Sequence, residues 1–335
     1  MDKKLKIALA QLNPLVGDVS GNIDKLISIR AGLKDDVDIL VAPELYVSGY
    51  PIDDLVLRED FLNLVEKEIN KLADSTKDKK SAIIVGAPRK DNNSIKNSVF
   101  VIENGKIISI KDKYELPNTG VFDEQRIFKQ GSLEDCADIK GVKFGLPICE
   151  YIWEKTVLEK LSKSGAEIII AINASPFTVS KNEERESVTK LRVNETKLPI
   201  VYLNRTGGQD ELIFDGSSFA LNHDGKKFYN SSEFKEETAQ ISFQKTNGKW
   251  AGQGNLNNNS SSTERLYKAL VLGLRDYVNN NKFSGVVLGL SGGVDSALVA
   301  ALATDAFGPD LVQAIMLPSP FTGDESLNDA KEAAE

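Results

Sequence analysis

Short apolar runs bounded by turn residues recur through residues 1–245 and alternate with segments of helical periodicity. The segments between the runs repeat apolar residues every three or four positions, as in Ile23, Leu26 and Ile27. Strands that alternate with helices predict an α/β domain with layered sheets and outer helices. The expected strands are Lys6–Leu12, Ile39–Ala42, Ala82–Gly86, Ser98–Glu103, Lys106–Lys111, Lys143–Ile148, Glu167–Ala171, Ile200–Asn204, Ser217–Asn222 and Ala239–Phe243, and the expected helices are Asn22–Leu33, Asp60–Ala73, Trp153–Ser164 and Glu183–Thr196.

A polar segment, Gly252-Gln-Gly-Asn-Leu-Asn-Asn-Asn-Ser-Ser-Ser262, interrupts this pattern. It holds too few apolar side chains to fold alone and is typical of a linker. The elements expected after it are a helix with Thr263 as its N-cap and an end near Asn279, a strand Gly285–Leu290, a helix Asp295–Phe307 and a strand Leu311–Leu317. Strand, helix and strand in this order predict a βαβ unit with parallel strands. The expected domains are residues 1–250 and 263–335, with a linker at residues 251–262.

Composition excludes several classes of function. The 335 residues carry a formal net charge of −8, which argues against a general nucleic-acid surface because phosphate binding needs clustered Lys and Arg. Two cysteines, Cys136 and Cys149, are too few for a disulfide framework, so a reducing, cytoplasmic setting is expected. No apolar run reaches the length of a membrane span, and the one after the charged start is too short for a signal peptide.

The single histidine restricts the chemistry further. His223 lies in Leu221-Asn-His-Asp-Gly225, which predicts a turn between two strands because Asp-Gly supplies the positive φ angles. An imidazole at the tip of a turn argues against Ser–His–Asp hydrolases, Cys–His hydrolases and His-ligated metal sites. Any hydrolytic chemistry in this chain therefore needs another base.

Three reactive side chains stand just after expected strands. Glu44 follows Ile39-Leu-Val-Ala-Pro43, Lys113 follows the run that ends at Lys111, and Cys149 follows Lys143–Ile148. A carboxylate next to buried residues is desolvated, which suits it to proton transfer. A thiol at a strand end that opens into a loop is placed to be accessible and rigidly held. Each residue alone has a structural alternative: a capping or salt-bridging glutamate, a surface lysine, or a packed cysteine.

Taken together, the order strand–Pro-Glu, Lys-x-x-Leu-Pro and strand–Cys-Glu resembles the nitrilase or carbon–nitrogen hydrolase superfamily. The resemblance implies an α–β–β–α sandwich and a Glu–Lys–Cys catalytic set that contains no histidine. It implies that the thiolate of Cys149 attacks an amide carbon and that Glu44 transfers protons. Lys113 would hold a positive charge near the sulfur and the developing oxyanion, with the backbone N–H after Cys149 as a second donor.

Longer stretches are similar to the glutaminase domains of the glutamine-dependent NAD⁺ synthetase family. They are residues 115–128, 173–177 and 204–216. Ser175 and Lys181 match positions that grip the α-amino and carboxylate ends of glutamine in this family. Two positions depart from the family pattern: Thr119 replaces a Tyr that contributes to glutamine binding, and Tyr151 replaces an Asp that follows Cys-Glu. The resemblance therefore implies L-glutamine as a substrate, bound by Thr119, Ser175 and Lys181.

The second part of the chain contains the string Val286-Val-Leu-Gly-Leu-Ser-Gly-Gly-Val-Asp-Ser-Ala297. It is not a Walker A loop, because Gly-Lys-Ser/Thr is absent. Glycines between a strand and a helix let backbone N–H groups approach an anion, although a Gly-Gly turn with an Asp/Ser cap is the structural alternative. The string resembles the ATP-pyrophosphatase loop, which implies an adenine-nucleotide α-hydrolase-like, Rossmann-like parallel-sheet domain. The expected ATP contacts are Gly289, Leu290, Ser291, Gly292, Gly293, Val294, Asp295 and Ser296, and Asp295 is also a candidate Mg²⁺ ligand.

Residues 266–277, 316–322 and 326–330 extend the similarity to NAD⁺ synthetases. The resemblance implies a ligase that hydrolyses glutamine and passes ammonia to adenylated deamido-NAD⁺, with ATP and Mg²⁺ needed only for the second step. Since the family's synthetase domain is longer than residues 263–335, this chain alone is expected to retain at most the glutaminase half. A homo-oligomer is expected for the full-length protein. The alternatives left open are a glutamine-fed ligase for another acid, a stand-alone amidase, and an inactive glutamine-binding or assembly module.

Overall fold

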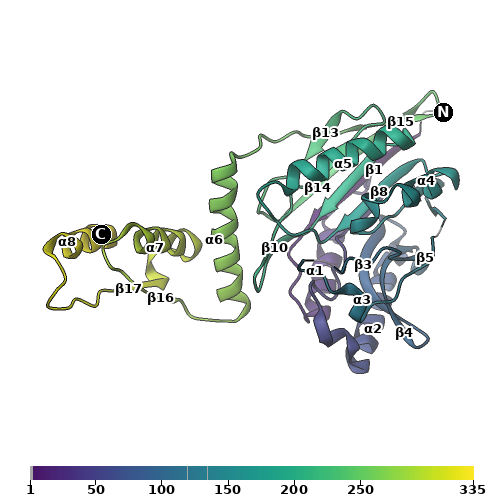
Figure 1. The fold of residues 1–335 in the computed structure, drawn as a ribbon. Coiled ribbons are helices and arrows are strands. Elements are labelled where there is room, and N and C mark those ends of the chain that lie inside the picture. Colours follow the sequence, from purple (N-terminus) through teal and green to yellow (C-terminus); the bar gives the residue numbers. More distant parts are fainter. Residues whose placement is uncertain (1–2, 119, 134) are drawn as a thin grey trace. The chain divides into compact units, whose positions relative to one another are not determined.

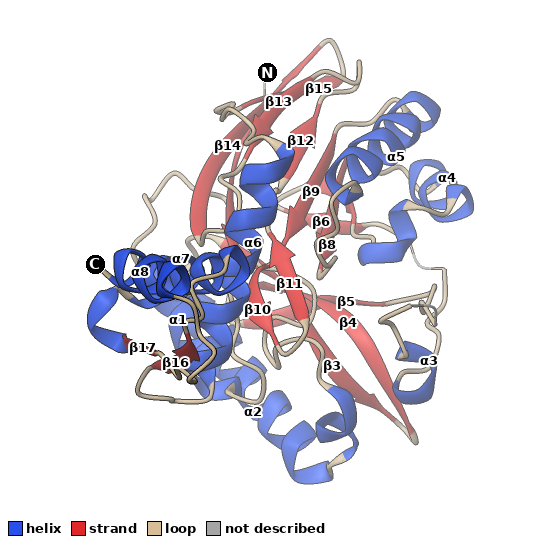
Figure 2. Cartoon of the chain, turned by 60° about the vertical axis from the view of Figure 1, so that its left-hand side comes forward, coloured by secondary structure: helices blue, strands red, loops and turns tan. Residues whose placement is uncertain are grey.

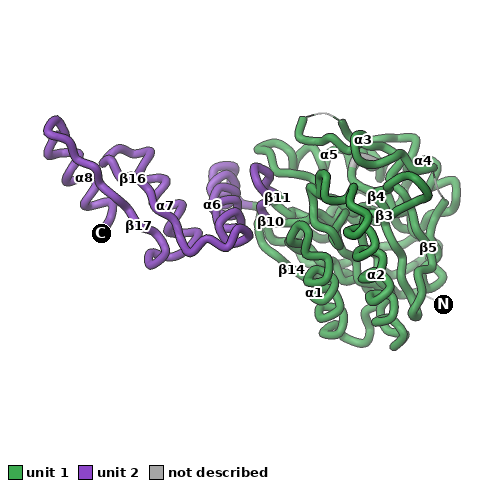
Figure 3. Tube along the Cα trace, turned by 90° about the horizontal axis from the view of Figure 1, so that it is seen from below, with its two compact units in different colours: residues 1–206, 214–259 green, residues 207–213, 260–335 purple. Residues whose placement is uncertain are grey.

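The computed structural model describes residues 3–118, 120–133 and 135–335. The chain divides into two compact units (Figure 3). Unit 1 comprises residues 1–206 and 214–259, and unit 2 comprises residues 207–213 and 260–335.

Over the described residues, the strands of unit 1 form a seven-stranded sheet, the large sheet, and a six-stranded sheet, the small sheet (Figure 1). The large sheet has the order β15 (Lys249–Gln253), β14 (Glu237–Thr246), β1 (Lys4–Gln11), β2 (Ile39–Val41), β3 (Ala82–Asp91), β4 (Ser94–Glu103) and β5 (Lys106–Asp112). The small sheet has the order β13 (Lys227–Asn230), β12 (Phe219–Leu221), β9 (Ile200–Asn204), β8 (Ile168–Asn173), β7 (Val142–Gly145) and β6 (Ala137–Ile139). In both sheets the central strands run parallel: β1, β2 and β3 in one, and β7, β8 and β9 in the other.

The core of unit 1 lies between the two sheets. Ile7, Ile39 and Ile84 of the large sheet pack in one buried cluster with Ile170 and Val201 of the small sheet. Side chains alternate between the faces of a strand, so each sheet has a second apolar face that needs a cover. Helices α1 (Val19–Ala31) and α2 (Glu59–Ser75) belong to the large sheet, and α4 (Lys155–Lys163) and α5 (Lys181–Thr196) to the small sheet (Figure 2). The result is the expected α–β–β–α sandwich.

Short helical segments connect these layers. They are η1 (Asp53–Leu57), η2 (Thr76–Asp78), α3 (Glu124–Ile127) and η3 (Cys149–Ile152). No helix among the described residues is both long and apolar enough to cross a membrane.

The strand boundaries differ from the expected ones where polar residues interrupt or follow the apolar run used to predict the strand. Strands β3 and β4 extend to Asp91 and from Ser94, because a tight turn with Asn92 at φ 52° joins them into one hairpin. The sequence interpretation missed β6 and β15, and it gave no bounds for β13, the strand that it expected after the turn at His223. His223 lies in the turn between β12 and β13, as expected. Strand β15 runs to Gln253, so the segment expected to be a linker begins inside the large sheet.

Unit 2 contains the expected βαβ arrangement. Strands β16 (Val286–Gly289) and β17 (Val312–Ile315) pair in parallel, and α7 (Val294–Phe307) packs on both. The remaining elements are α6 (Ser262–Asn280), η4 (Pro309–Leu311) and α8 (Asp324–Ala334). The expected N-cap of α6 was wrong: Ser261, not Thr263, caps the helix, and its hydroxyl accepts a hydrogen bond from the N–H of Glu264 at 3.2 Å.

A hairpin of β10 (Thr206–Gln209) and β11 (Leu212–Asp215) leaves unit 1, and its tip belongs to unit 2. The N–H of Gly208 donates to Asp276 of α6 at 2.7 Å. Two glycines allow this approach, since a Cβ on Gly208 would lie 3.1 Å from the Cα of Gly273. The hairpin was not expected from the sequence, because Gly207 and Gly208 are poor strand formers.

Candidate active site

The three reactive residues expected at strand ends lie together in the interior of unit 1. Glu44 follows β2, Lys113 follows β5, and Cys149 opens η3 just after β7. Glu44 and Lys113 are each 1% exposed and Cys149 is 4% exposed. Parallel strands end at the same edge of a sheet, and polar groups are delivered there by the loops that follow. The site therefore forms where strand ends of both sheets meet.

Lys113 is the centre of this cluster. Its Nζ donates to Oε1 of Glu44 at 2.7 Å and to Oε1 of Glu124 at 2.9 Å. Glu44 is held from two further sides, because its Oε1 accepts from Nδ2 of Asn97 at 2.8 Å and its Oε2 accepts from the N–H of Ala174 at 2.9 Å. Glu44 thus connects β4 of the large sheet with the end of β8 in the small sheet.

Charge couples Cys149 to this cluster. Burial alone would lower the pKa of Lys113, but the charges of Glu124, Glu44 and Cys149 outweigh it and raise the pKa. The lysine is therefore a permanent cation. The interaction is mutual: a thiolate at Cys149 stabilises the ammonium of Lys113, and the ammonium stabilises the thiolate by the same free energy. The thiolate is the form of cysteine that attacks carbonyl carbons.

Glu124 is a member of the site that the sequence interpretation did not single out. It is 4% exposed and stands at the start of α3. Burial, together with the charge of Glu44, raises its pKa to about 7 against the opposing charge of Lys113. Tyr50 donates a hydrogen bond to Glu124 at 3.3 Å. The pattern gave no sign of this role, because Glu124 lies in a polar stretch between Pro117 and Phe128 rather than at a strand end.

The backbone holds both ends of the cluster in unusual conformations. Cys149 has φ 48° and Leu45, next to Glu44, has φ 46°. Residues other than glycine adopt this left-handed region at a cost, and such strain concentrates at functional sites. Gly86 of β3 makes room for the Glu44 loop: its N–H donates to the carbonyl of Pro43 at 3.1 Å, and a Cβ there would lie 2.7 Å from the Cα of Glu44.

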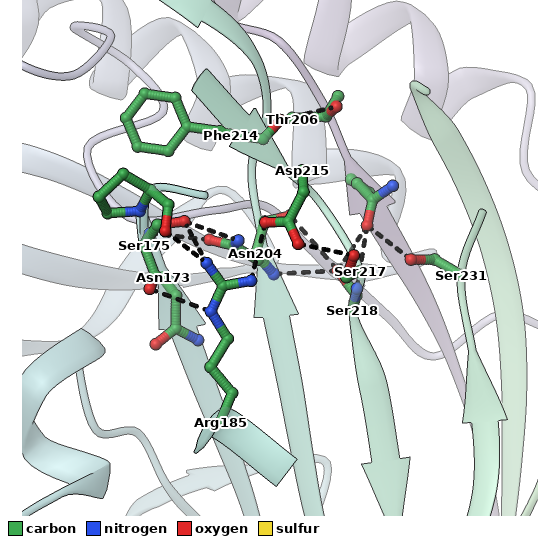
Figure 4. A network of polar contacts seen from close by, with 12 residues as sticks. Asn173, Ser175, Arg185, Asn204, Thr206, Phe214, Asp215, Ser217, Ser218 and Ser231 are labelled. Carbon is green, nitrogen blue, oxygen red and sulfur yellow. Dashed lines mark hydrogen bonds and ion pairs between the residues drawn. The ribbon is translucent and has the colours of Figure 1, made fainter. Parts of the chain in front are cut away.

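The residues expected to bind glutamine are placed unequally. Ser175 is buried just after β8, and its N–H donates to Oδ1 of Asn204 at 2.9 Å (Figure 4). Lys181 begins α5, pairs with Glu184 at 3.4 Å, and holds its Nζ 4.4 Å from the ring centroid of Trp153. Thr119 and the side chain of Tyr151 lie outside the described residues.

The expected pyrophosphate loop connects β16 to α7 in unit 2. Ser296 accepts from the N–H of Ser291 at 3.2 Å and donates to the carbonyl of Gly293 at 2.9 Å, so the two serines close the loop on itself. Gly292 has φ 82°, and a Cβ there would collide with the carbonyl oxygen of Ser326. The residues that line the pocket of about 290 Å³ beside the loop are Gly289, Leu290, Ser291, Ile315, Met316, Leu317, Pro318 and Thr322.

The candidate Mg²⁺ ligand Asp295 is exposed on the first turn of α7. Within the described residues, no three His, Cys, Asp or Glu side chains are grouped as a metal site. A single carboxylate fits Mg²⁺ only when phosphate oxygens of a substrate complete the coordination.

These features define a class of protein. The family model described as carbon-nitrogen hydrolase matches residues 6–251, so the chain belongs to the carbon–nitrogen hydrolase family. Residues 266–335 match the family model described as NAD synthase.

Over almost its whole length, this chain is similar to proteins named as glutamine-dependent NAD(+) synthetases. A glutamine-dependent NAD(+) synthetase of Rhodobacter capsulatus is 39% identical and covers 100% of this chain, and one of Aquifex aeolicus is 36% identical and covers 99%. The solved structure of the glutamine-dependent NAD⁺ synthetase from Acinetobacter baumannii with ADP matches 98% of the chain with a TM-score of 0.92 and 36% identity. The chain spans 61%, 64% and 62% of the lengths of these three proteins.

A carbon-nitrogen hydrolase from Helicobacter pylori shares the fold alone. The match includes 84% of this chain and 99% of the Helicobacter pylori protein, with a TM-score of 0.63 and 18% identity.

Proposed function

We propose that unit 1 hydrolyses the side-chain amide of L-glutamine and that the whole protein uses the ammonia to convert deamido-NAD⁺ into NAD⁺. The observation that carries the proposal is the buried cluster of Glu44, Lys113 and Cys149: Lys113 forms an ion pair with Glu44, and its charge interacts with that of Cys149. The substrates are those of the glutamine-dependent NAD(+) synthetases that the chain resembles.

The reaction proceeds through a thioester. Cys149 gives its proton to Glu44, and the thiolate forms a C–S bond with the amide carbon. Lys113 and the backbone N–H after Cys149 stabilise the oxyanion. The C–N bond then breaks, and Glu44 returns the proton to the departing ammonia. Glu44 next takes a proton from water, which attacks the thioester and releases glutamate, and the proton returns to the sulfur.

Substrate recognition is assigned to Ser175 and Lys181, with Thr119 as a third contact. An ammonium suits the α-carboxylate of glutamine, and a hydroxyl can bond to either its α-amino or its α-carboxylate group. The hydrocarbon–amide part of the substrate then extends toward Cys149.

In unit 2, we assign the loop from Gly289 to Ser296 to ATP. Backbone N–H groups and the start of α7 favour phosphate oxygens. Asp295 would hold Mg²⁺ together with those oxygens, and the bound ion would neutralise phosphate charge. We infer a glutaminase domain that runs beyond residue 250 to the end of β15 at Gln253, and a synthetase region at residues 263–335, joined by the polar segment between them. The two family matches, over residues 6–251 and 266–335, support this division.

The test is ammonia release from glutamine by this chain and by Cys149→Ala. We expect release by the unsubstituted chain and a loss of about 10⁴-fold or more in the variant, since removing a covalent nucleophile abolishes its pathway. Equal rates would disprove the hydrolytic assignment. A second assay measures pyrophosphate release from ATP by the full-length protein, with deamido-NAD⁺ or with other carboxylic acids as the acid substrate. Release with another acid alone would favour a different amide ligase.

A further inference from the structure

An ion pair that the hydrolytic mechanism does not use is fully buried next to Ser175. Nη1 of Arg185, on α5, donates to Oδ1 of Asp215, at the end of β11, at 2.7 Å, and both side chains are 0% exposed (Figure 4). Desolvating two charges costs about as much as their attraction returns, so a buried ion pair is weak evidence for a stabilising role. Its position relative to other groups is therefore the informative feature.

The remaining donors of Arg185 converge on one short segment. Nε donates to Oγ of Ser175 at 3.1 Å, and Nη2 donates to the carbonyls of Ser175 and Pro176, both at 2.8 Å. Asn204 holds the same residue as well, since its Nδ2 donates to the carbonyl of Ser175 at 3.0 Å. The guanidinium is planar and its donors are rigidly spaced, so Arg185 fixes backbone and hydroxyl of Ser175 together.

This geometry sets the polarity of the Ser175 hydroxyl. A guanidinium can only donate, so Oγ must accept from Arg185, and the hydroxyl proton needs an acceptor: the phenol oxygen of the buried Tyr202 is one, and a bound carboxylate would be a stronger one. A carboxylate is such an acceptor, whereas an ammonium is not. Asp215 in turn prevents the guanidinium from rotating, because Nη1 is committed to the ion pair. The hydroxyl of Ser217 also donates to Oδ2 of Asp215 at 2.8 Å, so both carboxylate oxygens of Asp215 are bonded and its orientation is fixed.

We propose that Arg185, oriented by Asp215, is a positioning residue that presents the Ser175 hydroxyl as a donor to the α-carboxylate of glutamine. The inference rests on the proposed glutaminase function and extends it to the group that Ser175 recognises. Arg185 acts on the substrate through Ser175.

The experiment measures KM and kcat for glutamine together with the rate at which iodoacetamide alkylates Cys149. Arg185→Lys keeps the charge but loses the fork, and Asp215→Asn keeps an acceptor but loses the counter-charge. For both we expect KM to rise about tenfold or more, since the loss concerns substrate positioning. We expect kcat at saturating glutamine to change less than about threefold and the alkylation rate less than about twofold.

Two controls separate positioning from stability. Asp78→Asn breaks another pair with a buried arginine, Arg30, at 2.6 Å and away from Ser175, and KM should not change. In a Ser175→Ala background, Arg185→Lys should no longer raise KM, because an effect exerted through Ser175 disappears with its hydroxyl.

The proposal is overturned if Arg185→Lys raises KM by the same factor with and without the Ser175 hydroxyl. It is also overturned if KM in Arg185→Lys and Asp215→Asn equals that of the control. If either variant fails to fold, the other carries the same comparison. An unsubstituted chain that releases no ammonia would instead refute the glutaminase function, and this inference with it, before any variant is measured.

Discussion

Replacing Lys113 with methionine removes the cation between two buried carboxylates while keeping a side chain of similar length. Nζ of Lys113 lies 2.7 Å from Glu44 and 2.9 Å from Glu124, and the three side chains are 0%, 1% and 4% exposed. Removing one partner of a buried ion pair costs about 3–5 kcal/mol, because the remaining charge is left uncompensated. We expect Lys113→Met to lose about this much free energy of unfolding at pH 8.

The loss should depend on pH. Without the ammonium, two neighbouring carboxylates cannot both stay ionised, so one binds a proton as the pH falls and the penalty shrinks. Urea unfolding at about pH 8 and about pH 5 measures both values. Glutamine hydrolysis should fall by about 10²–10³-fold at either pH because an oxyanion donor is lost. Lys90→Met is the matched control: its pair with Glu59 is 2.8 Å long but exposed, and exposed pairs contribute about 0–1 kcal/mol. A loss below about 1 kcal/mol in Lys113→Met, equal at both pH values, would refute this reasoning.

Three further predictions concern single positions. Burial raises the pKa of Glu124 to about 7, so its stability contribution is present below about pH 4.5 and is lost as the pH rises through about 7. Between acid and alkaline pH, the unfolding free energy of the unsubstituted chain should therefore fall by about 3 kcal/mol more than that of Glu124→Gln. The same pH dependence in both proteins, measured by urea unfolding, would contradict this. Gly86→Ala should lower kcat for glutamine about 10²-fold by displacing Glu44, and an unchanged kcat would show that the loop tolerates a methyl group. Gly292→Ala should weaken ADP binding in calorimetry without changing glutamine hydrolysis, because φ 82° and the Ser326 carbonyl exclude a Cβ; equal affinity would contradict it.

The fold class could be predicted from the sequence because burial imposes period and composition on long elements. Strands β1 and β9 have continuous apolar centres, at Ile7–Ala10 and Ile200–Leu203, and the predicted runs at Lys6–Leu12 and Ile200–Asn204 coincide with the strands closely. Strands β6 and β13 and the hairpin ends are short or mix polar with apolar residues, as Asp138 in β6 and Lys227 in β13 show. Their pairing is decided by partners far away in the chain, which no local pattern records.

The site was predictable to the extent that its residues follow strands. Glu44 and Cys149 stand after strands, and Lys113 was predicted with them because the order of the three motifs resembles that of carbon–nitrogen hydrolases. Arg185 and Glu124 could not be singled out in this way, because a charged residue on a helix resembles a solvated one until packing shows that it is buried. Arg185 lies among Glu183, Glu184 and Glu186 on α5, yet only Arg185 is fully enclosed.

The central claim is that Cys149 becomes covalently attached to the substrate. The chain is mixed with glutamine, quenched in acid during turnover, digested and analysed by mass spectrometry. The account predicts a γ-glutamyl group on the peptide that contains Cys149, which disappears once glutamine is exhausted. An unmodified peptide, combined with undiminished ammonia release by Cys149→Ala, would contradict it.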